Sequence, residues 1–186
     1  ERVEFEQTLP AYNALVADLN LINVDSFRFL AEFQRQLEDR ITGGALLICF
    51  TSRPNLHSPE GLRNKYSWLP GFDSSAEIRE DLVDKVAVAQ EANGIAEAFA
   101  SLVRGFYATC SFPKGFGADP YNVVLRGDDG TPVGLLKRVG SGCVLLVPQC
   151  EEKRSVIESI LGWWAGETRA EGMTPARPEA APAGAG

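Results

Sequence analysis

Two apolar runs separated by an amphipathic segment constrain the fold of this chain more than any other feature. Residues 12–19 and 45–50 are nearly continuous apolar runs, as expected of strands that are covered on both faces. Between them, apolar side chains recur every three or four residues over 25–40, which predicts a helix capped by Asn23 or Asp25. The connections are short, so the unit is strand–helix–strand, and this order predicts parallel pairing with a right-handed crossover.

The last third of the chain predicts an antiparallel meander. Three strand-like runs, at 122–126, 133–139 and 143–148, are separated by turns that are rich in glycine and aspartate. A final helix is expected over 151–164, because its apolar residues share one face. Beyond this helix the composition shifts to Ala, Gly and Pro without periodicity, which predicts a disordered tail or linker over 166–186.

The middle of the chain is less regular. Residues 51–75 contain several prolines and glycines together with aromatic side chains, a composition that indicates a long loop. Weaker patterns predict a strand over 3–6, a helical turn within 73–84, a strand over 85–90, a helix over 95–103 and a strand over 106–112.

Charge and composition exclude several classes of protein. The chain has 25 acidic and 18 basic residues, for a net charge of −7, and the basic residues are scattered, so nucleic acid is not an expected partner. No apolar run approaches the roughly 20 residues that span a bilayer, and no signal peptide is visible, so a cytoplasmic protein without a membrane span is expected. The four cysteines form no CxxC pair and are expected to be reduced, mostly buried thiols.

Two stretches of the sequence resemble class I glutamine-amidotransferase-like domains, a fold that trehalose-utilisation-type proteins share. The first stretch is the run 12–19 with the following helix and the Gly-Gly-led strand of 43–50, and the second is 132–148 with its Gly-Ser-Gly turn. The resemblance implies one α/β domain over 1–165 that lacks the family's first strand and helix. Its expected core is a mainly parallel, flavodoxin-like sheet flanked by helices, with a C-terminal antiparallel meander and a final helix.

The resemblance also implies that the catalytic machinery is degenerate. Active members carry a nucleophilic cysteine on a glycine-flanked elbow and a His-x-Glu pair after the last strand. Cys49 lies near the matching strand end, but no glycine flanks it. The His-x-Glu position holds Gln149, Cys150 and Glu151, without an imidazole. The only histidine, His57, lies in the loop after Cys49, so a Cys49–His57 dyad is the remaining catalytic hypothesis.

Two classes of function therefore stay open. The first is a non-catalytic module that binds a ligand or a protein and belongs to a larger protein or assembly. The alternative is a small cysteine-dependent hydrolase or amidotransferase that uses Cys49. A weaker third hypothesis is a sensor of a sugar- or nucleotide-related ligand. No cofactor or metal is expected, because the chain has no nucleotide-binding glycine motif and only one histidine with dispersed cysteines.

Any binding is expected beyond the carboxyl ends of the parallel strands, where open α/β sheets hold their ligands. A protein partner or a small-molecule ligand would meet the polar and aromatic residues that follow these strands. The candidate contacts are Asp18, Asn20, Thr51, Ser52, Arg53, Tyr66, Trp68, Gln149 and Glu151. For Tyr66, Trp68 and Phe72 a second interpretation stays open, in which they form a hydrophobic plug over the sheet.

Overall fold

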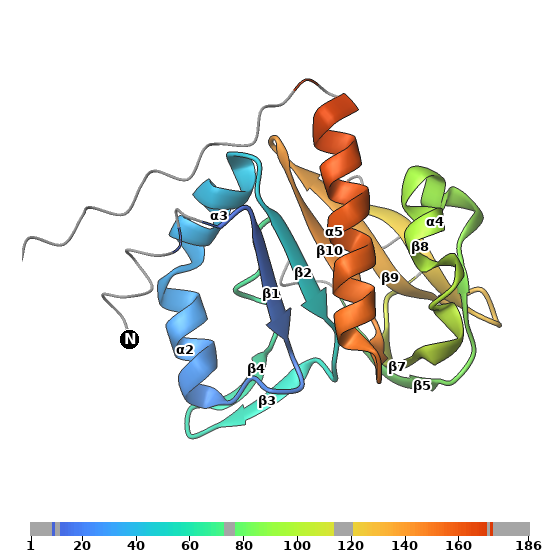
Figure 1. Cartoon of the computed structure of the whole chain (residues 1–186). Coiled ribbons are helices and arrows are strands. Elements are labelled where there is room, and N and C mark those ends of the chain that lie inside the picture. The colour runs from blue at the N-terminus through green and yellow to red at the C-terminus, as the bar shows by residue number, and fades with distance from the viewer. Residues whose placement is uncertain (1–8, 10–11, 73–76, 114–120, 171, 173–186) are drawn as a thin grey trace, which may run out of the picture.

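A mixed sheet forms the centre of the computed structural model, which describes residues 9, 12–72, 77–113, 121–170 and 172. Its strands are β1 (Ala14–Asp18), β2 (Leu46–Phe50), β6 (Val86–Val88), β8 (Tyr121–Gly127), β9 (Pro132–Val139) and β10 (Gly142–Val147). They are arranged in the order β1-β2-β10-β9-β8-β6. Figure 1 labels all of these strands except β6. The fold is therefore of the α/β class.

The strand–helix–strand unit is present as predicted. β1 pairs in parallel with β2, and Val16 lies opposite Ile48 in that register. The segment between them forms two helices, α2 (Val24–Glu32) and α3 (Gln34–Thr42), rather than the single helix expected over 25–40. They meet at Phe33, whose buried side chain turns into the protein interior at the break. The α2 helix begins at Asn23, whose side chain accepts a hydrogen bond from the Ser26 amide.

The expectation of a mainly parallel sheet is wrong, because the antiparallel meander belongs to the same sheet. β10 pairs in parallel with β2 on one side and antiparallel with β9 on the other. β8 and β6 extend the sheet as further antiparallel neighbours. The short β8–β9 and β9–β10 turns leave no room for the crossover that a parallel pair requires.

The region between β2 and β8 holds further short strands. β3 (Asn55–Ser58) and β4 (Gly61–Asn64) form a hairpin within the expected loop. β5 (Arg79–Val83) pairs with β7 (Phe106–Ser111), which also pairs with β11 (Gln149–Cys150). The helical turn expected within 73–84 is therefore wrong for its second half, and 73–76 lie outside the described residues. β5 is mostly exposed and charged, so it lacks the alternation that predicts a strand.

The remaining helices differ from expectation mainly in their limits. The helix expected over 95–103 is divided into the 3-10 helix η2 (Gln90–Ile95), α4 (Ala96–Ala100) and the 3-10 helix η3 (Val103–Gly105). The final helix, α5 (Lys153–Ala170), starts later and continues beyond the expected domain boundary at 165. The strand expected over 3–6 and the tail beyond 172 lie outside the described residues.

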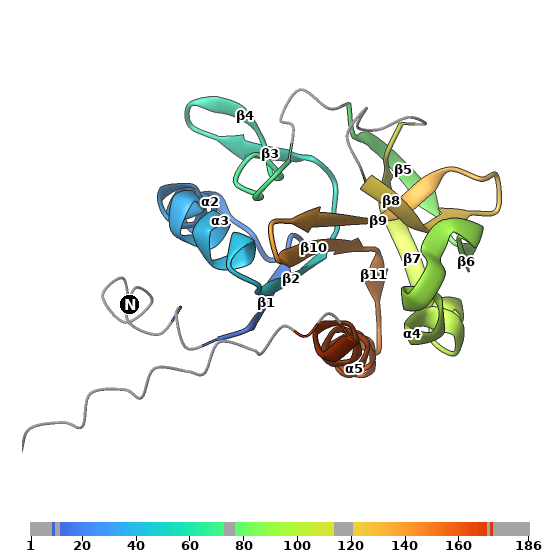
Figure 2. The same cartoon turned by 90° about the horizontal axis from the view of Figure 1, so that it is seen from above.

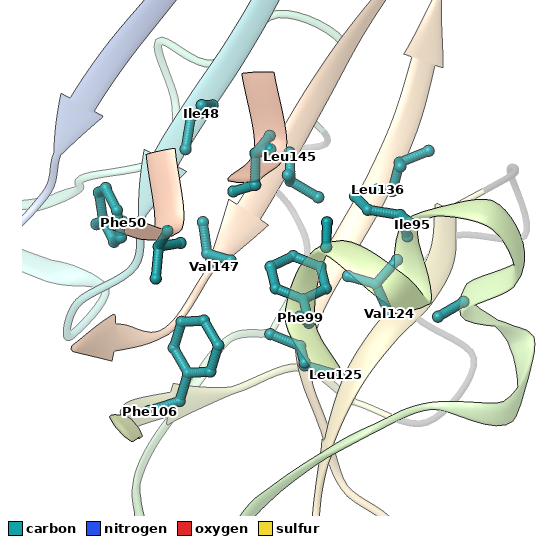
Figure 3. Packing of buried hydrophobic residues seen from close by; sticks show 14 of the residues in the cluster. Ile48, Phe50, Ile95, Phe99, Phe106, Val124, Leu125, Leu136, Leu145 and Val147 are labelled. Carbon is teal, nitrogen blue, oxygen red and sulfur yellow. The ribbon is translucent and has the colours of Figure 1, made fainter. Parts of the chain in front are cut away.

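Helices cover both faces of the sheet, so the core has two halves (Figure 2). On the α4 and α5 side, Ile48 and Leu145 pack with Phe99 and Phe106, as Figure 3 shows. On the α2 and α3 side, Leu47 and Leu146 pack with residues from the chain that follows β4. Within the described ranges, we find no helix with the length and apolar character needed to cross a membrane.

Candidate functional site

The carboxyl ends of β1, β2 and β10 lie side by side at one edge of the sheet. Asp18 is opposite Phe50, and Phe50 is opposite Val147. Backbone hydrogen bonds continue just beyond these ends. The Leu19 amide donates to the Phe50 carbonyl at 2.9 Å, and the Thr51 amide donates to the Val147 carbonyl at 2.7 Å. The fold thus brings together Asp18, Thr51 and Gln149, which the sequence placed at three separate strand ends.

A hydrogen-bond network centred on Asp18 joins these strand ends. Gln149 Nε2 donates to Asp18 Oδ1 at 3.0 Å and to the Thr51 carbonyl at 2.9 Å. Lys153, in the first turn of α5, donates to Asp18 Oδ2 and forms an ion pair with it. The Asn20 amide donates to Asp18 Oδ1 at 3.0 Å. Lys153 was not predicted from the sequence, because only the fold brings α5 beside β1.

The protonation state of Asp18 follows from these contacts. Burial disfavours the charged carboxylate, but the hydrogen bonds from Lys153 and Gln149 outweigh it, so the pKa of Asp18 lies below its ordinary value. The Asp18 side chain is 14% exposed and that of Lys153 is 35% exposed, so the pair is partly accessible.

Among the described residues at this edge, Gln149 Oε1 is buried without a hydrogen-bond partner, whereas the Thr51 side chain interacts with the Cys110 thiol. Both residues are almost fully enclosed. An unpaired buried polar atom costs roughly 1–3 kcal/mol, and native proteins usually satisfy such atoms with protein, water or ligand groups. Gln149 Oε1 is therefore an acceptor at this edge with unused hydrogen-bonding capacity.

The aromatic candidates lie in the core instead of on a contact surface. Tyr66 and Trp68 are buried, and the Tyr66 ring stacks on Phe72 with centroids 5.5 Å apart. The Tyr66 hydroxyl donates to the Ser52 carbonyl at 2.7 Å and accepts from the Ser52 amide at 3.1 Å. Tyr66 and Trp68 therefore match the interpretation as a hydrophobic plug over the sheet. The expectation that they contact a partner is corrected, because both side chains are buried. The chain needs these rings to cover the α2 and α3 side of the sheet.

The other candidates are divided between the interior and the surface. Ser52 is buried, and its hydroxyl lies 3.3 Å from Lys65 Nζ. Asn20, Arg53 and Glu151 are exposed. Arg53 lines a crevice of about 230 Å³ with Glu80, Asp81, Leu82 and Thr109, beside β5 and β7.

Cys49 and His57 do not form a catalytic pair in this structure. Cys49 has 0% of its surface exposed and belongs to the same buried cluster as Tyr66 and Leu146. Burial raises the pKa of the Cys49 thiol far above its ordinary value. His57 is exposed on β3, where it pairs with Leu62 across the hairpin. A buried neutral thiol and an exposed imidazole lack the contact that general-base activation requires.

The remaining cysteines are also poor nucleophiles. Cys110, Cys143 and Cys150 are free and buried, and burial raises the pKa of each. In the part of the chain that the structure describes, no group of three or more His, Cys, Asp or Glu side chains is arranged to hold a metal ion.

Fold and site together define a mixed α/β protein with a polar cluster at its parallel strand ends. No family model matches the chain, and no curated protein matches it in sequence. Several solved structures are partly similar to it. The cytoplasmic protein STM3548 from Salmonella typhimurium is 11% identical with a TM-score of 0.49, and the match covers 88% of this chain and 74% of that one.

Two larger proteins resemble the chain over a part of their length. A beta-galactosidase from Bacillus circulans sp. alkalophilus is 15% identical with a TM-score of 0.47, and the match covers 85% of this chain and 23% of that one. The exo-beta-1,4-mannosidase Op5Man5 from Opitutaceae bacterium strain TAV5 is 15% identical with a TM-score of 0.39, over 83% and 25%. The chain thus spans about a quarter of either protein. These likenesses are too slight to assign a family.

Proposed function

We propose that this chain is a non-catalytic binding module with a degenerate class I glutamine-amidotransferase-like fold, belonging to a larger protein or assembly. The observation that carries the proposal is the enclosure of Cys49, which stands where the resemblance expects the nucleophile. A thiol acts as a nucleophile only when it is accessible and can be deprotonated. Gln149, near the expected position of the base, is an amide, and its nitrogen already donates to Asp18 and Thr51.

The arrangement of the parallel strands supports the fold assignment. The stretches that carry the resemblance, 12–19, 43–50 and 132–148, supply β1, β2 and the β9–β10 pair, which are consecutive in the sheet. Helices lie on both faces of this part, which is the layering of a flavodoxin-like domain (Figure 2). On this proposal β8 and β6 are an antiparallel extension of the same sheet.

The proposed binding surface is the edge formed by the ends of β1, β2 and β10. The Asp18–Lys153 pair is partly exposed, and Asn20 is exposed next to it. Gln149 Oε1 has no hydrogen-bond partner among the described residues and can accept a hydrogen bond. A ligand or a protein segment with N–H donors, such as a primary amide or an ammonium group, matches this set.

The absence of catalysis is tested by the reactivity of Cys49. The native chain is treated with iodoacetamide at neutral pH, and the labelled positions are identified by mass spectrometry of the intact protein and its peptides. We expect Cys49 to react only after denaturation, because its thiol is neutral and enclosed. Rapid, selective labelling of native Cys49 would contradict the proposal and support the cysteine-dependent hydrolase or amidotransferase.

The binding surface is tested by a melting-temperature screen against small primary amides and amines. Compounds that raise the melting temperature are then measured with Gln149→Leu, which removes the unpaired oxygen, and with Gln36→Leu, a control substitution at an exposed amide on α3. We expect the stabilisation to disappear in Gln149→Leu and to persist in the control. Stabilisation that is equal in both variants would place the ligand elsewhere and overturn the assignment of this edge.

A further inference from the structure

A crevice of about 190 Å³ lies on the α4 and α5 side of the sheet, away from the strand-end cluster. It opens between η2, the neighbouring strands β8 and β9, and the second half of α5. Its polar lining comes from Glu91, Asn122, Arg138, Trp163 and Glu167, and Gly94 completes one wall. Trp163 stands ten residues after Lys153, which is about 15 Å along the helix axis. The crevice and the strand-end cluster share no residue.

Because Gly94 has no side chain, a hydrogen-bond donor and an acceptor border the same free space beside it. A side-chain carbon at this position would lie 3.5 Å from Glu167 Oε1 and 3.8 Å from Trp163 Nε1, so both atoms border the space that the glycine leaves free. Trp163 Nε1 is buried and has no hydrogen-bond partner among the described residues. An indole nitrogen can only donate, so this N–H is suited to meet an acceptor from a bound molecule.

The charges that line the crevice are balanced within the protein. Arg138 Nη2 donates to Glu167 Oε2 at 2.6 Å, and its guanidinium carbon lies 5.8 Å from the centre of the Trp163 ring. Glu91 Oε1 accepts from Arg126 Nη2 at 2.6 Å. Each carboxylate already has a cationic partner, so a ligand with a net charge would leave that charge uncompensated. Buried Ile95 and Leu136 supply apolar surface beside these groups.

We propose that this crevice binds a small neutral polyhydroxyl compound, of the monosaccharide or cyclic polyol class. A hydroxyl group both donates and accepts, so adjacent hydroxyls can donate to Glu167 Oε1 and accept from the Trp163 N–H. The C–H groups of such a compound fit the apolar wall at Ile95 and Leu136. The volume is below the roughly 300–1,000 Å³ of pockets that hold drug-sized ligands, which limits the occupant to a small molecule.

The test follows the indole N–H signal of Trp163 in the nitrogen-15 NMR spectrum of the full chain. The chain has three tryptophans, and the signal that Trp163→Phe removes identifies Trp163. The probes are D-glucose, D-galactose, D-mannose, D-xylose and myo-inositol, with gluconate as the charged comparison. We expect a saturable shift of this signal with at least one neutral probe, at a millimolar dissociation constant, and weaker binding of gluconate.

Filling the crevice should abolish the effect. Gly94→Leu places a side chain against Glu167 and Trp163 at a position without left-handed backbone, so the variant is expected to fold. We expect it to weaken binding by at least about tenfold. Gly105→Leu is the matched control, because a β-carbon added there would have no described atom within 4 Å.

Three results would overturn the proposal: no saturable shift with any neutral probe, unchanged binding by Gly94→Leu, or tighter binding of gluconate than of every neutral probe. The binding module proposed above is independent of this outcome, because Cys49 labelling and the amide screen report on the other site.

Discussion

At the scale of single residues, Asp18 shows how one carboxylate can join distant parts of a chain. It accepts hydrogen bonds from the Asn20 amide, the Gln149 side chain and Lys153. These donors belong to the loop after β1, to β11 and to the first turn of α5. Because all three favour the charged form, the pKa of Asp18 lies below its ordinary value of 3.8 despite partial burial.

This shift predicts a pH dependence of stability that Asp18→Asn should reduce. A carboxyl group with a lowered pKa in the folded state contributes stability that is complete above its unfolded pKa. That contribution is lost as the pH falls through the lower folded value. We expect Asp18→Asn to lower the free energy of unfolding by about 1 kcal/mol at neutral pH, and this difference to shrink below pH 3.8.

Urea unfolding of both proteins at neutral pH and at about pH 3 measures this difference. Asp39→Asn serves as the control, because Asp39 is an exposed residue of α3. A stability difference that is the same at both pH values would show that the Asp18 network does not lower the pKa of the carboxyl.

The sequence predicts part of this residue-level picture. Asp18, Thr51 and Gln149 are recognisable because each follows or ends an apolar run, and parallel strands end at one edge. Lys153 carries no comparable signal, since it lies 135 positions from its partner Asp18. The burial of Trp68 is equally hidden, because a proline- and glycine-rich segment gives no periodicity that shows which way its side chains point.

At the scale of elements, the β9–β10 turn packs closely against the C-terminal end of α3. The Ser141 amide donates to the Thr42 carbonyl at 2.9 Å, and the Cys143 amide donates to the Ala45 carbonyl at 3.1 Å. A side-chain carbon on Gly142 would collide with the carbonyl oxygens of Ile41 and Ala45. Two backbones therefore approach here as closely as glycine permits.

Gly142→Ala should separate these two backbones and destabilise the protein strongly. We expect a loss of about 3 kcal/mol or more in the free energy of unfolding, because neither carbonyl can move without breaking a neighbouring hydrogen bond. Gly162→Ala is the matched control. It adds the same methyl group to α5, where no atom of the described residues lies within 4 Å, and should stabilise by up to about 1 kcal/mol. Denaturant unfolding compares the two, and equal stability of Gly142→Ala and the native chain would contradict the close approach.

Elements with a strong periodic pattern are predictable from this sequence, and elements that depend on distant partners are not. The apolar runs that form β1 and β2 identified a parallel pair, and the glycine turns identified the β8–β9–β10 meander. β5 was missed because only Val83 among its residues is buried, and its pairing with β7 decides its conformation. The break between α2 and α3 was missed because Phe33 fits the helical period as well as its neighbours do.

At the scale of the whole molecule, one sheet supplies both halves of the core. Neighbouring residues of β2 point to opposite faces, so Ile48 packs under α5 while Leu47 packs under α3. Leu145 and Leu146 divide in the same way on β10. Loss of either half therefore uncovers the strands on which the other half depends.

This shared sheet predicts a single cooperative unfolding transition. Trp68 reports on the α2 and α3 side, and Trp164 reports on the α5 side. The variant Trp68→Phe keeps the tryptophans of α5, and the double variant Trp163→Phe/Trp164→Phe keeps only Trp68. In each variant we expect the urea midpoint measured by fluorescence to equal the midpoint measured by circular dichroism. A fluorescence midpoint in either variant that departs from its circular dichroism midpoint would show that the two halves unfold separately.

The pairing of β2 with β10 has a consequence for the chain as it is synthesised. Leu46 of β2 lies opposite Cys143 of β10, so the strand that closes the parallel ladder leaves the ribosome roughly a hundred residues after its neighbour, a delay of about 5–20 s. Throughout this interval one edge of β2 stays unpaired and can pair with another nascent chain. The yield of folded protein is therefore expected to depend on how quickly the segment between the two strands is translated.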